Sequence, residues 1–298
     1  MSRAWIHEVA PRDGLQNEPG VLPTSVKLEL AGLLAAARPD SIELTSFVRP
    51  DLLPALADAD ELAHAVAAAA WRRQVELYAL VANARGYERF RRSGLDGVTL
   101  LVSATDGHSL ANVRRSVQQA LEQSCALART ARAEGFRIRA YVSMAFGCPY
   151  DGPPAPSRVE EIAAALVEAG ADTLLLADTL GVGEPGQVED IGGRALALLP
   201  GERLGLHAHD SFGRAGDNVR AAWRLGFRHF DAAAGGCGGC PFAPGAAGNL
   251  GTAELLEVLA GEGAETRAEP RALAAATRYL VTALEAGAPP RPPRARDR

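Results

Sequence analysis

The sequence predicts an α/β protein with a single domain, folded as a (β/α)8 TIM barrel. Short apolar or β-branched runs recur along the chain and alternate with helical segments. Their starts lie about 30 residues apart, which is the length of one strand–helix unit. Eight such units imply a parallel sheet, and eight is the number of strands that closes a barrel. A length of 298 residues suits one barrel of this kind.

The expected strands are the short runs rich in Val, Leu, Ile and Ala. They lie at Trp5–Val9, Ser41–Leu44, Val75–Leu80, Gly97–Val102, Arg137–Val142, Thr173–Ala177, Arg203–Ala208 and Phe230–Ala233. Amphipathic segments rich in alanine and leucine predict the helices between them, such as Ser25–Ala37, Ser109–Glu134, Pro156–Ala169 and Val188–Leu199. Several helices are expected to end at a C-cap glycine, namely Gly135, Gly170 and Gly226.

An open, doubly wound sheet is the structural alternative. Such a sheet usually has a glycine-rich phosphate turn after its first strand. Here the first strand runs into Pro11-Arg12-Asp13-Gly14 instead, which favours the barrel. We expect the barrel domain to span residues 1–288 and the Pro- and Arg-rich residues 289–298 to form a disordered tail.

Composition argues against several classes of function. The formal net charge of −5 argues against a nucleic-acid partner. No run approaches the roughly 18 apolar residues that span a bilayer, and the amino terminus lacks the apolar core of an export signal. Four cysteines in a chain of this length do not make a disulfide framework. We therefore expect a cytoplasmic protein with no membrane partner.

Polar side chains stand where the strands are expected to end, which is the rim that carries the active site in barrel enzymes. His207 and His209 lie two residues apart at the end of the seventh strand, so both imidazoles face the barrel axis. Alone, such a pair is as often two hydrogen-bonded polar residues as a metal site. Asp13 and the amide of Asn249 favour the metal site, because this donor set suits Mg²⁺ or Mn²⁺. Ligand type alone leaves zinc and iron open.

Three further polar residues fall on the same rim. Arg12 next to Asp13 has the spacing of a surface ion pair, but its place on the first barrel loop suits stabilisation of an enolate or thioester oxyanion. Glu43 lies near the end of the second strand, and Asp178 follows the sixth.

Two cysteines stand in the glycine-rich loop from Gly235 to Gly251. Cys237-Gly238-Gly239-Cys240 resembles half of a zinc ribbon, but no second pair completes it. A lone loop cysteine is usually inert. On a mobile lid, however, the mostly protonated thiol of Cys240 suits a proton donor. Cys237 is then either a bystander or an oxidation partner.

At these residues the sequence resembles the hydroxymethylglutaryl-CoA lyases, which belong to the metallolyase barrels together with isopropylmalate and homocitrate synthases. The Gly-Gly-Cys-Pro loop is the discriminating feature, because the synthases carry a glutamate-containing loop there. The matching segments follow the family order and are Val9–Glu18, Glu43–Val48, Gly147–Tyr150, Ala177–Gly183, His207–Asp210 and Gly238–Asn249.

The resemblance implies a role for each rim residue. The implied ligands of Mg²⁺ or Mn²⁺ are Asp13, His207, His209 and Asn249. The implied catalytic residues are Arg12, Asp178, His207 and Cys240, with Glu43 supporting Arg12 or metal-bound waters. In this scheme His207 or Asp178 removes a hydroxyl proton, Arg12 stabilises the enolate, and Cys240 protonates it.

The implied reaction is carbon–carbon cleavage of 3-hydroxy-3-methylglutaryl-CoA to acetoacetate and acetyl-CoA, as in leucine degradation and ketone-body formation. The implied partners are the acyl-CoA substrate and a second copy of the chain in a homodimer.

Some positions depart from the lyase pattern and bear on substrate preference: Pro19, Ser103–Asp106, Cys237 and Ala253. A lyase for a longer or branched 3-hydroxy-3-acylglutaryl-CoA is therefore an alternative, as is a Claisen-type synthase that joins an acyl-CoA to a 2-oxo acid. A non-enzymatic barrel that binds metal or CoA is the remaining alternative, and the complete set of rim residues argues against it.

Overall fold

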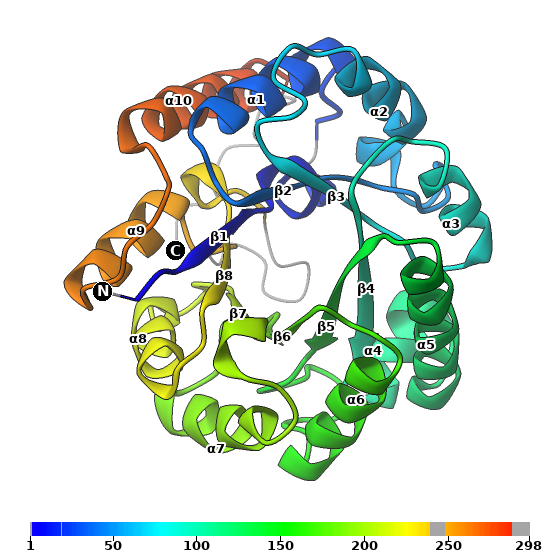
Figure 1. Ribbon diagram of the computed structural model, residues 1–298, viewed down its shortest axis with the longest axis vertical. Helices are drawn as coiled ribbons and strands as arrows, with labels where there is room; N and C mark the ends of the chain where they lie inside the picture. Colours follow the sequence, from blue (N-terminus) through cyan, green and yellow to red (C-terminus); the bar gives the residue numbers. More distant parts are fainter. Residues whose placement is uncertain (1, 19, 239–247, 288–298) are drawn as a thin grey trace, which may run out of the picture.

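Parallel strands close into a barrel in sequence order, and the helices form an outer ring around it (Figure 1). This computed structural model describes residues 2–18, 20–238 and 248–287. The strands are β1 (Trp5–Glu8), β2 (Ser41–Ser46), β3 (Glu76–Leu80), β4 (Gly97–Ser103), β5 (Arg137–Ser143), β6 (Thr173–Asp178), β7 (Leu204–Ala208) and β8 (His229–Ala232). Pairing of β1 with both β2 and β8 closes the sheet and confirms the predicted (β/α)8 barrel.

The helices follow the strands as predicted, and three of the four predicted helix ranges agree with the structure to within a few residues. The α-helices are α1 (Thr24–Ala36), α2 (Ala59–Ala67), α3 (Ala84–Phe90), α4 (Asp106–Val113), α5 (Val117–Ala133), α6 (Pro156–Glu168), α7 (Pro185–Leu196), α8 (Ala215–Leu225), α9 (Thr252–Gly261) and α10 (Pro270–Gly287). Short turns are a π-helical turn, η1 (Ala10–Gly14), and the 3-10 turns η2 (Pro54–Leu56), η3 (Gly201–Arg203) and η4 (Ala234–Gly236).

The single predicted helix Ser109–Glu134 is wrong, because the structure divides this stretch into α4 and α5. Arg114 adopts a left-handed conformation with φ of 56°, which stops α4. Ser116 then begins α5 with a capping box, in which its hydroxyl accepts a hydrogen bond from the Gln119 amide. An apolar period alone does not reveal a break of this length, since α4 and α5 both bury one side.

The predicted C-cap glycines are confirmed. Gly135, Gly170 and Gly226 follow α5, α6 and α8 with φ of 83°, 111° and 110°, a region that favours glycine. The predicted tail, residues 289–298, lies outside the described residues. Within the described ranges no helix combines the length and the apolar character needed to cross a membrane.

The outward faces of the strands are covered by the helices. Leu30 and Leu34 of α1 and Ile42 and Leu44 of β2 are fully buried. Burying a side chain of this size contributes about 1.5–3 kcal/mol, so the layer between sheet and helices stabilises the closed barrel.

The interior of the barrel carries buried charge. Arg139 and Tyr141 of β5 lie two residues apart and share a face. Arg139 Nη2 donates to Asp231 Oδ1 at 2.7 Å, and the Tyr141 hydroxyl donates to Asp231 Oδ2 at 2.6 Å. Because β5 and β8 are not neighbours in the sheet, these hydrogen bonds cross the interior. The network leads to the carboxyl ends of the strands, where the predicted site lies.

Candidate active site

The turn after β1 holds Arg12 and Asp13 at the rim of the barrel. The carbonyl oxygen of Val9 accepts hydrogen bonds from the backbone amides of Arg12, Asp13 and Gly14 at 2.8–3.2 Å, which forms the π-helical turn η1. Gly14 packs closely against the loop after β8, since a Cβ on it would lie 2.2 Å from Cys237 Sγ. The Pro-Arg-Asp-Gly motif therefore fixes two functional side chains on a tight turn against the loop after β8.

The end of β7 brings His209 beside Asn249. Residues 249 and 209 form an isolated antiparallel bridge, and Leu250 N donates to Ala208 O at 3.0 Å. The carboxyl end of the glycine-rich loop thus extends the sheet edge at the rim. This pairing explains how residues forty positions apart in sequence come to share one site.

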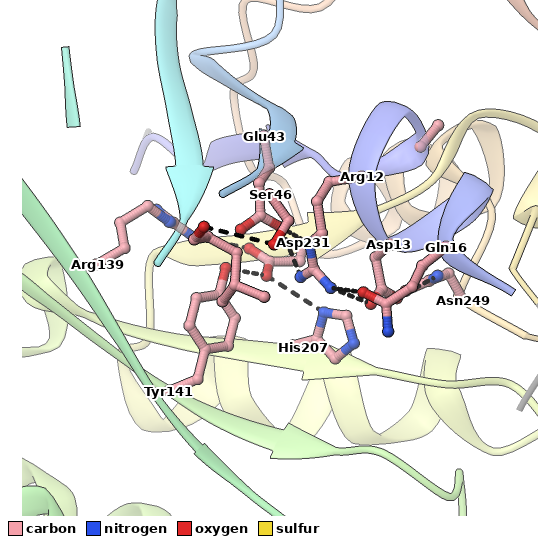
Figure 2. A network of polar contacts seen from close by, with 12 residues as sticks. Arg12, Asp13, Gln16, Glu43, Ser46, Arg139, Tyr141, His207, Asp231 and Asn249 are labelled. Atoms are coloured by element: carbon pink, nitrogen blue, oxygen red, sulfur yellow. Dashed lines mark hydrogen bonds and ion pairs between the residues drawn. The ribbon is translucent and has the colours of Figure 1, made fainter. Parts of the chain in front are cut away.

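Asp13, His207 and His209 each offer a ligand atom, and these atoms all lie within 4.8 Å of one another. Asn249 joins them, since its Nδ2 donates to Asp13 Oδ2 at 2.8 Å and to Cys237 O at 3.1 Å. Figure 2 shows Arg12, Asp13, His207 and Asn249 gathered from different segments of the chain. The convergence predicted from the sequence is present.

The donor set fits a divalent cation. Asn249 Oδ1 and His209 Nδ1 are buried and have no hydrogen-bond partner among the described residues, and buried polar atoms of this kind normally have one. Burial raises the pKa of Asp13, but Arg12 and the two histidines outweigh it and hold the pKa well below its usual range. Asp13 is therefore an anion at neutral pH, as a metal ligand must be.

Arg12 lies between two carboxylates. Its Nε donates to Glu43 Oε2 at 2.6 Å and its Nη1 donates to Asp13 Oδ1 at 2.6 Å. Burial disfavours the charge on Arg12, yet Glu43 and then Asp13 outweigh burial and raise its pKa. Burial also raises the pKa of Glu43, which Arg12 opposes. Of the two roles implied for Glu43, support of Arg12 or of metal-bound waters, the structure shows contact with Arg12, and this contact holds the guanidinium charged at the rim.

His207 is held from behind by Asp231. His207 Nδ1 lies 3.2 Å from Asp231 Oδ2, and Figure 2 shows Asp231 at the junction between His207 and the Arg139 and Tyr141 side chains. Burial lowers the pKa of His207, but the hydrogen bond to Asp231 and the charge of Asp13 outweigh burial and raise it. A carboxylate behind Nδ1 fixes the tautomer that presents Nε2 to the site.

Asp231, Arg139 and Tyr141 were missed by the sequence reasoning. The predicted fifth strand carries a signal for two of them. Arg137, Arg139 and Tyr141 share one face of that strand, and the apolar residues between them share the other. In a barrel strand the polar side of such an alternation faces the interior.

Asp178 lies at the end of β6, as predicted, but its carboxylate is bound by its own loop. Oδ1 accepts from Val182 N at 3.0 Å and Oδ2 from Gly183 N at 2.8 Å. Burial raises the pKa of Asp178, and these backbone hydrogen bonds oppose the rise. Its contacts are those of a residue that shapes the β6–α7 loop. Cys240, the predicted proton donor, lies outside the described residues.

Comparison with known proteins places this chain in a family. The model of the HMGL-like family matches residues 3–280. The chain belongs to the HMGL-like family. It is 39% identical to the (R)-citramalyl-CoA lyase of Chloroflexus aurantiacus, over 95% of this chain and 92% of that protein. It is 35% identical to the hydroxymethylglutaryl-CoA lyase YngG of Bacillus subtilis, over 93% and 92% of the two chains.

Solved structures agree with this membership of the HMGL-like family. The HMG-CoA lyase of Brucella melitensis superposes with a TM-score of 0.92 at 37% identity, over 96% of this chain and all of that one. An HMG-CoA lyase from Acinetobacter baumannii, in complex with coenzyme A and 3-methylmalate, gives a TM-score of 0.88 at 34% identity, over 95% and 92%. This HMGL-like protein is a lyase with a TIM-barrel fold, and the predicted resemblance is confirmed.

Proposed function

We propose that this lyase cleaves the carbon–carbon bond of 3-hydroxy-3-methylglutaryl-CoA, giving acetoacetate and acetyl-CoA, with Mg²⁺ or Mn²⁺ bound. The observation that carries the proposal is the meeting of Asp13, His207 and His209 beside Asn249 and the Arg12 guanidinium. Hydroxymethylglutaryl-CoA lyases among the relatives and the solved structures support it.

The proposed metal ligands are Asp13, His207, His209 and Asn249. A divalent cation held there supplies Lewis-acid polarisation and orientation of substrate oxygens. Mg²⁺ and Mn²⁺ fit the carboxylate and amide oxygens of the set, and two imidazoles are also accepted by Mn²⁺.

His207 is the proposed base. Its Nδ1 faces Asp231, so Nε2 is the nitrogen that faces the site, and Asp231 stabilises the imidazolium after proton transfer. One nitrogen cannot bind a cation and accept a proton at once. Asp13, His209 and Asn249 would therefore hold the cation when His207 Nε2 takes the 3-hydroxyl proton. The contacts of Asp178 support a positioning role for it.

The bond between C2 and C3 then breaks. Its electron pair forms the thioester enolate, and C3 becomes the carbonyl carbon of the released oxo acid. Arg12 stabilises the enolate oxygen, since a guanidinium has five N–H groups and can hold two carboxylates while donating to an oxyanion. The thiol of Cys240 donates its proton to C2 and completes acetyl-CoA.

(R)-Citramalyl-CoA is the second candidate substrate, favoured by the 39% identity to a lyase of that name. It lacks one methylene between the hydroxyl carbon and the distal carboxylate, and its cleavage gives pyruvate instead of acetoacetate. One methylene is worth about 1–3 kcal/mol of discrimination in a shaped pocket. The two substrates should therefore differ clearly in kcat/KM.

The test supplies each thioester to the purified protein with Mg²⁺ or Mn²⁺ and quantifies acetyl-CoA, acetoacetate and pyruvate. The proposal expects the higher kcat/KM with 3-hydroxy-3-methylglutaryl-CoA and loss of turnover with a chelator. Arg12→Gln, purified identically, excludes a contaminating lyase. Preference for citramalyl-CoA would transfer the assignment to the second candidate. No cleavage of either thioester would overturn both.

We further propose a cytoplasmic homodimer. Three described cysteines, Cys125, Cys148 and Cys237, are free thiols, which suits a reducing compartment. A zebrafish relative is named as a cytoplasmic 3-hydroxy-3-methylglutaryl-CoA lyase, and this chain is 36% identical to it. Size-exclusion chromatography with light scattering measures the molar mass, and a mass of one chain would contradict the dimer.

A further inference from the structure

A second cavity opens at the amino-terminal ends of the strands, at the opposite end of the barrel from the candidate active site. It encloses about 780 Å³ and is lined by the starts of β1, β2, β3, β5, β6 and β8 with their preceding loops. This volume lies in the range of small-molecule sites. The amino-terminal end of a barrel normally contributes to stability and not to chemistry, so the proposed reaction does not account for a polar cavity there.

The cavity has an excess of positive charge. Six arginines line it: Arg3, Arg72, Arg73, Arg137, Arg139 and Arg267. Its four acidic residues all accept hydrogen bonds from the protein already. Asp40, Asp96 and Asp172 each accept one from a backbone amide of the neighbouring strand, and Glu76 accepts one from the Tyr78 hydroxyl. The exposed Arg73 and Arg137 form no ion pair with any described residue. Two cationic side chains are therefore available to a ligand.

Two buried donors also lack partners. Arg139 is 3% exposed and His7 is 1% exposed, and both line the cavity. Arg139 Nε and His7 Nε2 have no hydrogen-bond partner among the described residues. The Tyr78 ring lies next to both, with its centroid 5.4 Å from the His7 ring and 5.9 Å from Arg139 Cζ. A buried donor left unpaired is costly, so such atoms normally meet a ligand or water.

The state of His7 adds a hydrogen-bond donor to the floor of the cavity. Burial and the nearby Arg139 charge lower its pKa well below the usual value, so the ring is neutral. His7 Nδ1 lies 2.5 Å from the Ser41 hydroxyl. When Nδ1 accepts the hydroxyl hydrogen, the single ring hydrogen is on Nε2, which is the nitrogen without a partner.

We propose that this amino-terminal cavity binds a small, multiply charged oxyanion, either a phosphate or a polycarboxylate. Arg73 and Arg137 donate to it and neutralise its charge from the rim, and Arg139 and His7 form the polar floor beneath it. Oxyanions are the ligands that guanidinium groups hold with directed, charge-assisted hydrogen bonds. The cavity lies at the opposite end of the barrel from the proposed lyase chemistry, and Arg139 links the two ends through Asp231 and His207.

The test is titration calorimetry of the full chain, treated with chelator, against inorganic phosphate in one arm and citrate in the other. The cavity variant is Arg73→Ala/Arg137→Ala, in which both changed side chains are exposed and folding is checked by circular dichroism. The matched control is Arg115→Ala/Arg129→Ala, which removes the same charge from exposed positions outside the cavity. Arg12→Gln reports binding at the candidate active site.

We expect the wild type to bind one of the two probes, and the tighter probe identifies the class of anion. The cavity variant should raise the dissociation constant about tenfold or more, the loss typical of removed charge-assisted contacts. The control and Arg12→Gln should stay within about twofold of wild type. No binding by wild type, equal losses in the cavity and control variants, or a loss confined to Arg12→Gln would each overturn the proposal.

Discussion

Arg12 joins two acidic residues at the rim, because it donates to both the proposed ligand Asp13 and the buried Glu43. We expect Arg12→Gln to lower kcat by about 10²–10³-fold, the usual loss for one charge-stabilising donor. Metal content, measured by mass spectrometry, should stay at the wild-type stoichiometry because Arg12 is not a proposed ligand.

The control for Arg12→Gln addresses the carboxylate that it leaves behind. Glu43 is fully buried, and its Oε1 has no partner among the described residues. Removal of Arg12 therefore leaves a buried carboxylate without its charge partner. The double variant Arg12→Gln/Glu43→Gln removes that acid. Recovery of most of the wild-type rate in the double variant would show that Arg12 only neutralises Glu43.

Asp231 acts through His207 and is a positioning residue. Replacement of Asp231 by Asn keeps the shape but removes the charge that raises the pKa of His207. Partners behind a ligand typically contribute 10–100-fold to metal affinity or activity. We therefore expect Asp231→Asn to lower kcat or weaken Mn²⁺ binding by about this factor. If the variant unfolds at a lower temperature but has normal kcat and Mn²⁺ affinity at 20 °C, then Asp231 has a structural role alone.

At the scale of single elements, the sequence predicts what is local and misses what depends on a partner. His207 and His209 share a face because they stand two apart on one strand, and that period is readable in the sequence. The hydrogen bonds from β5 to Asp231 of β8 join residues 90 or more positions apart, and no local sequence pattern predicts them. The break between α4 and α5 depends on a left-handed Arg114, a conformation that no sequence rule requires of arginine.

Glu8 joins three elements of the barrel, and the sequence gives no sign of these contacts. Its carboxylate accepts from Ala10 N and Ala234 N at 2.9 Å and from the Thr252 hydroxyl at 2.7 Å, so it ties β1 to the loop after β8 and to α9. Burial raises its pKa to about 7, against the three hydrogen bonds, which lower it.

The raised pKa of Glu8 makes stability depend on pH. The folded state holds the proton more tightly than the unfolded state, in which a glutamate has a pKa of about 4.3. Stabilisation is complete below the unfolded value and is lost as the pH rises toward about 7. Between pH 5 and pH 7 the free energy of unfolding should therefore fall further in wild type than in Glu8→Gln. The difference between the two falls should be about 1–3 kcal/mol. Urea unfolding of both proteins at each pH measures the difference, and parallel pH curves would contradict it.

At the scale of the whole molecule, both ends of the barrel are tied together by one interior network. Arg139 lines the amino-terminal cavity and also binds Asp231, which contacts His207 at the opposite rim. Charges inside a barrel need partners, and here the partners come from strands on different sides. The interior side chains Arg139 and Asp231 therefore also hold His207 in place at the candidate active site.

The proposed ligands come from the turn η1 after β1, from the end of β7 and from the glycine-rich loop, so a cation bound there should stabilise the entire barrel. A ligand that binds only the folded state at 100 times its dissociation constant adds about 2.7 kcal/mol. For a chain of 298 residues that corresponds to a rise in Tm of about 4 °C. Differential scanning calorimetry with Mn²⁺, with Mg²⁺ and with chelator should show this rise in wild type. His209→Ala should lose it relative to its own metal-free form, while the exposed His64→Ala should keep it. An equal rise in all three proteins would place the cation elsewhere and remove the ligand set on which the proposed chemistry rests.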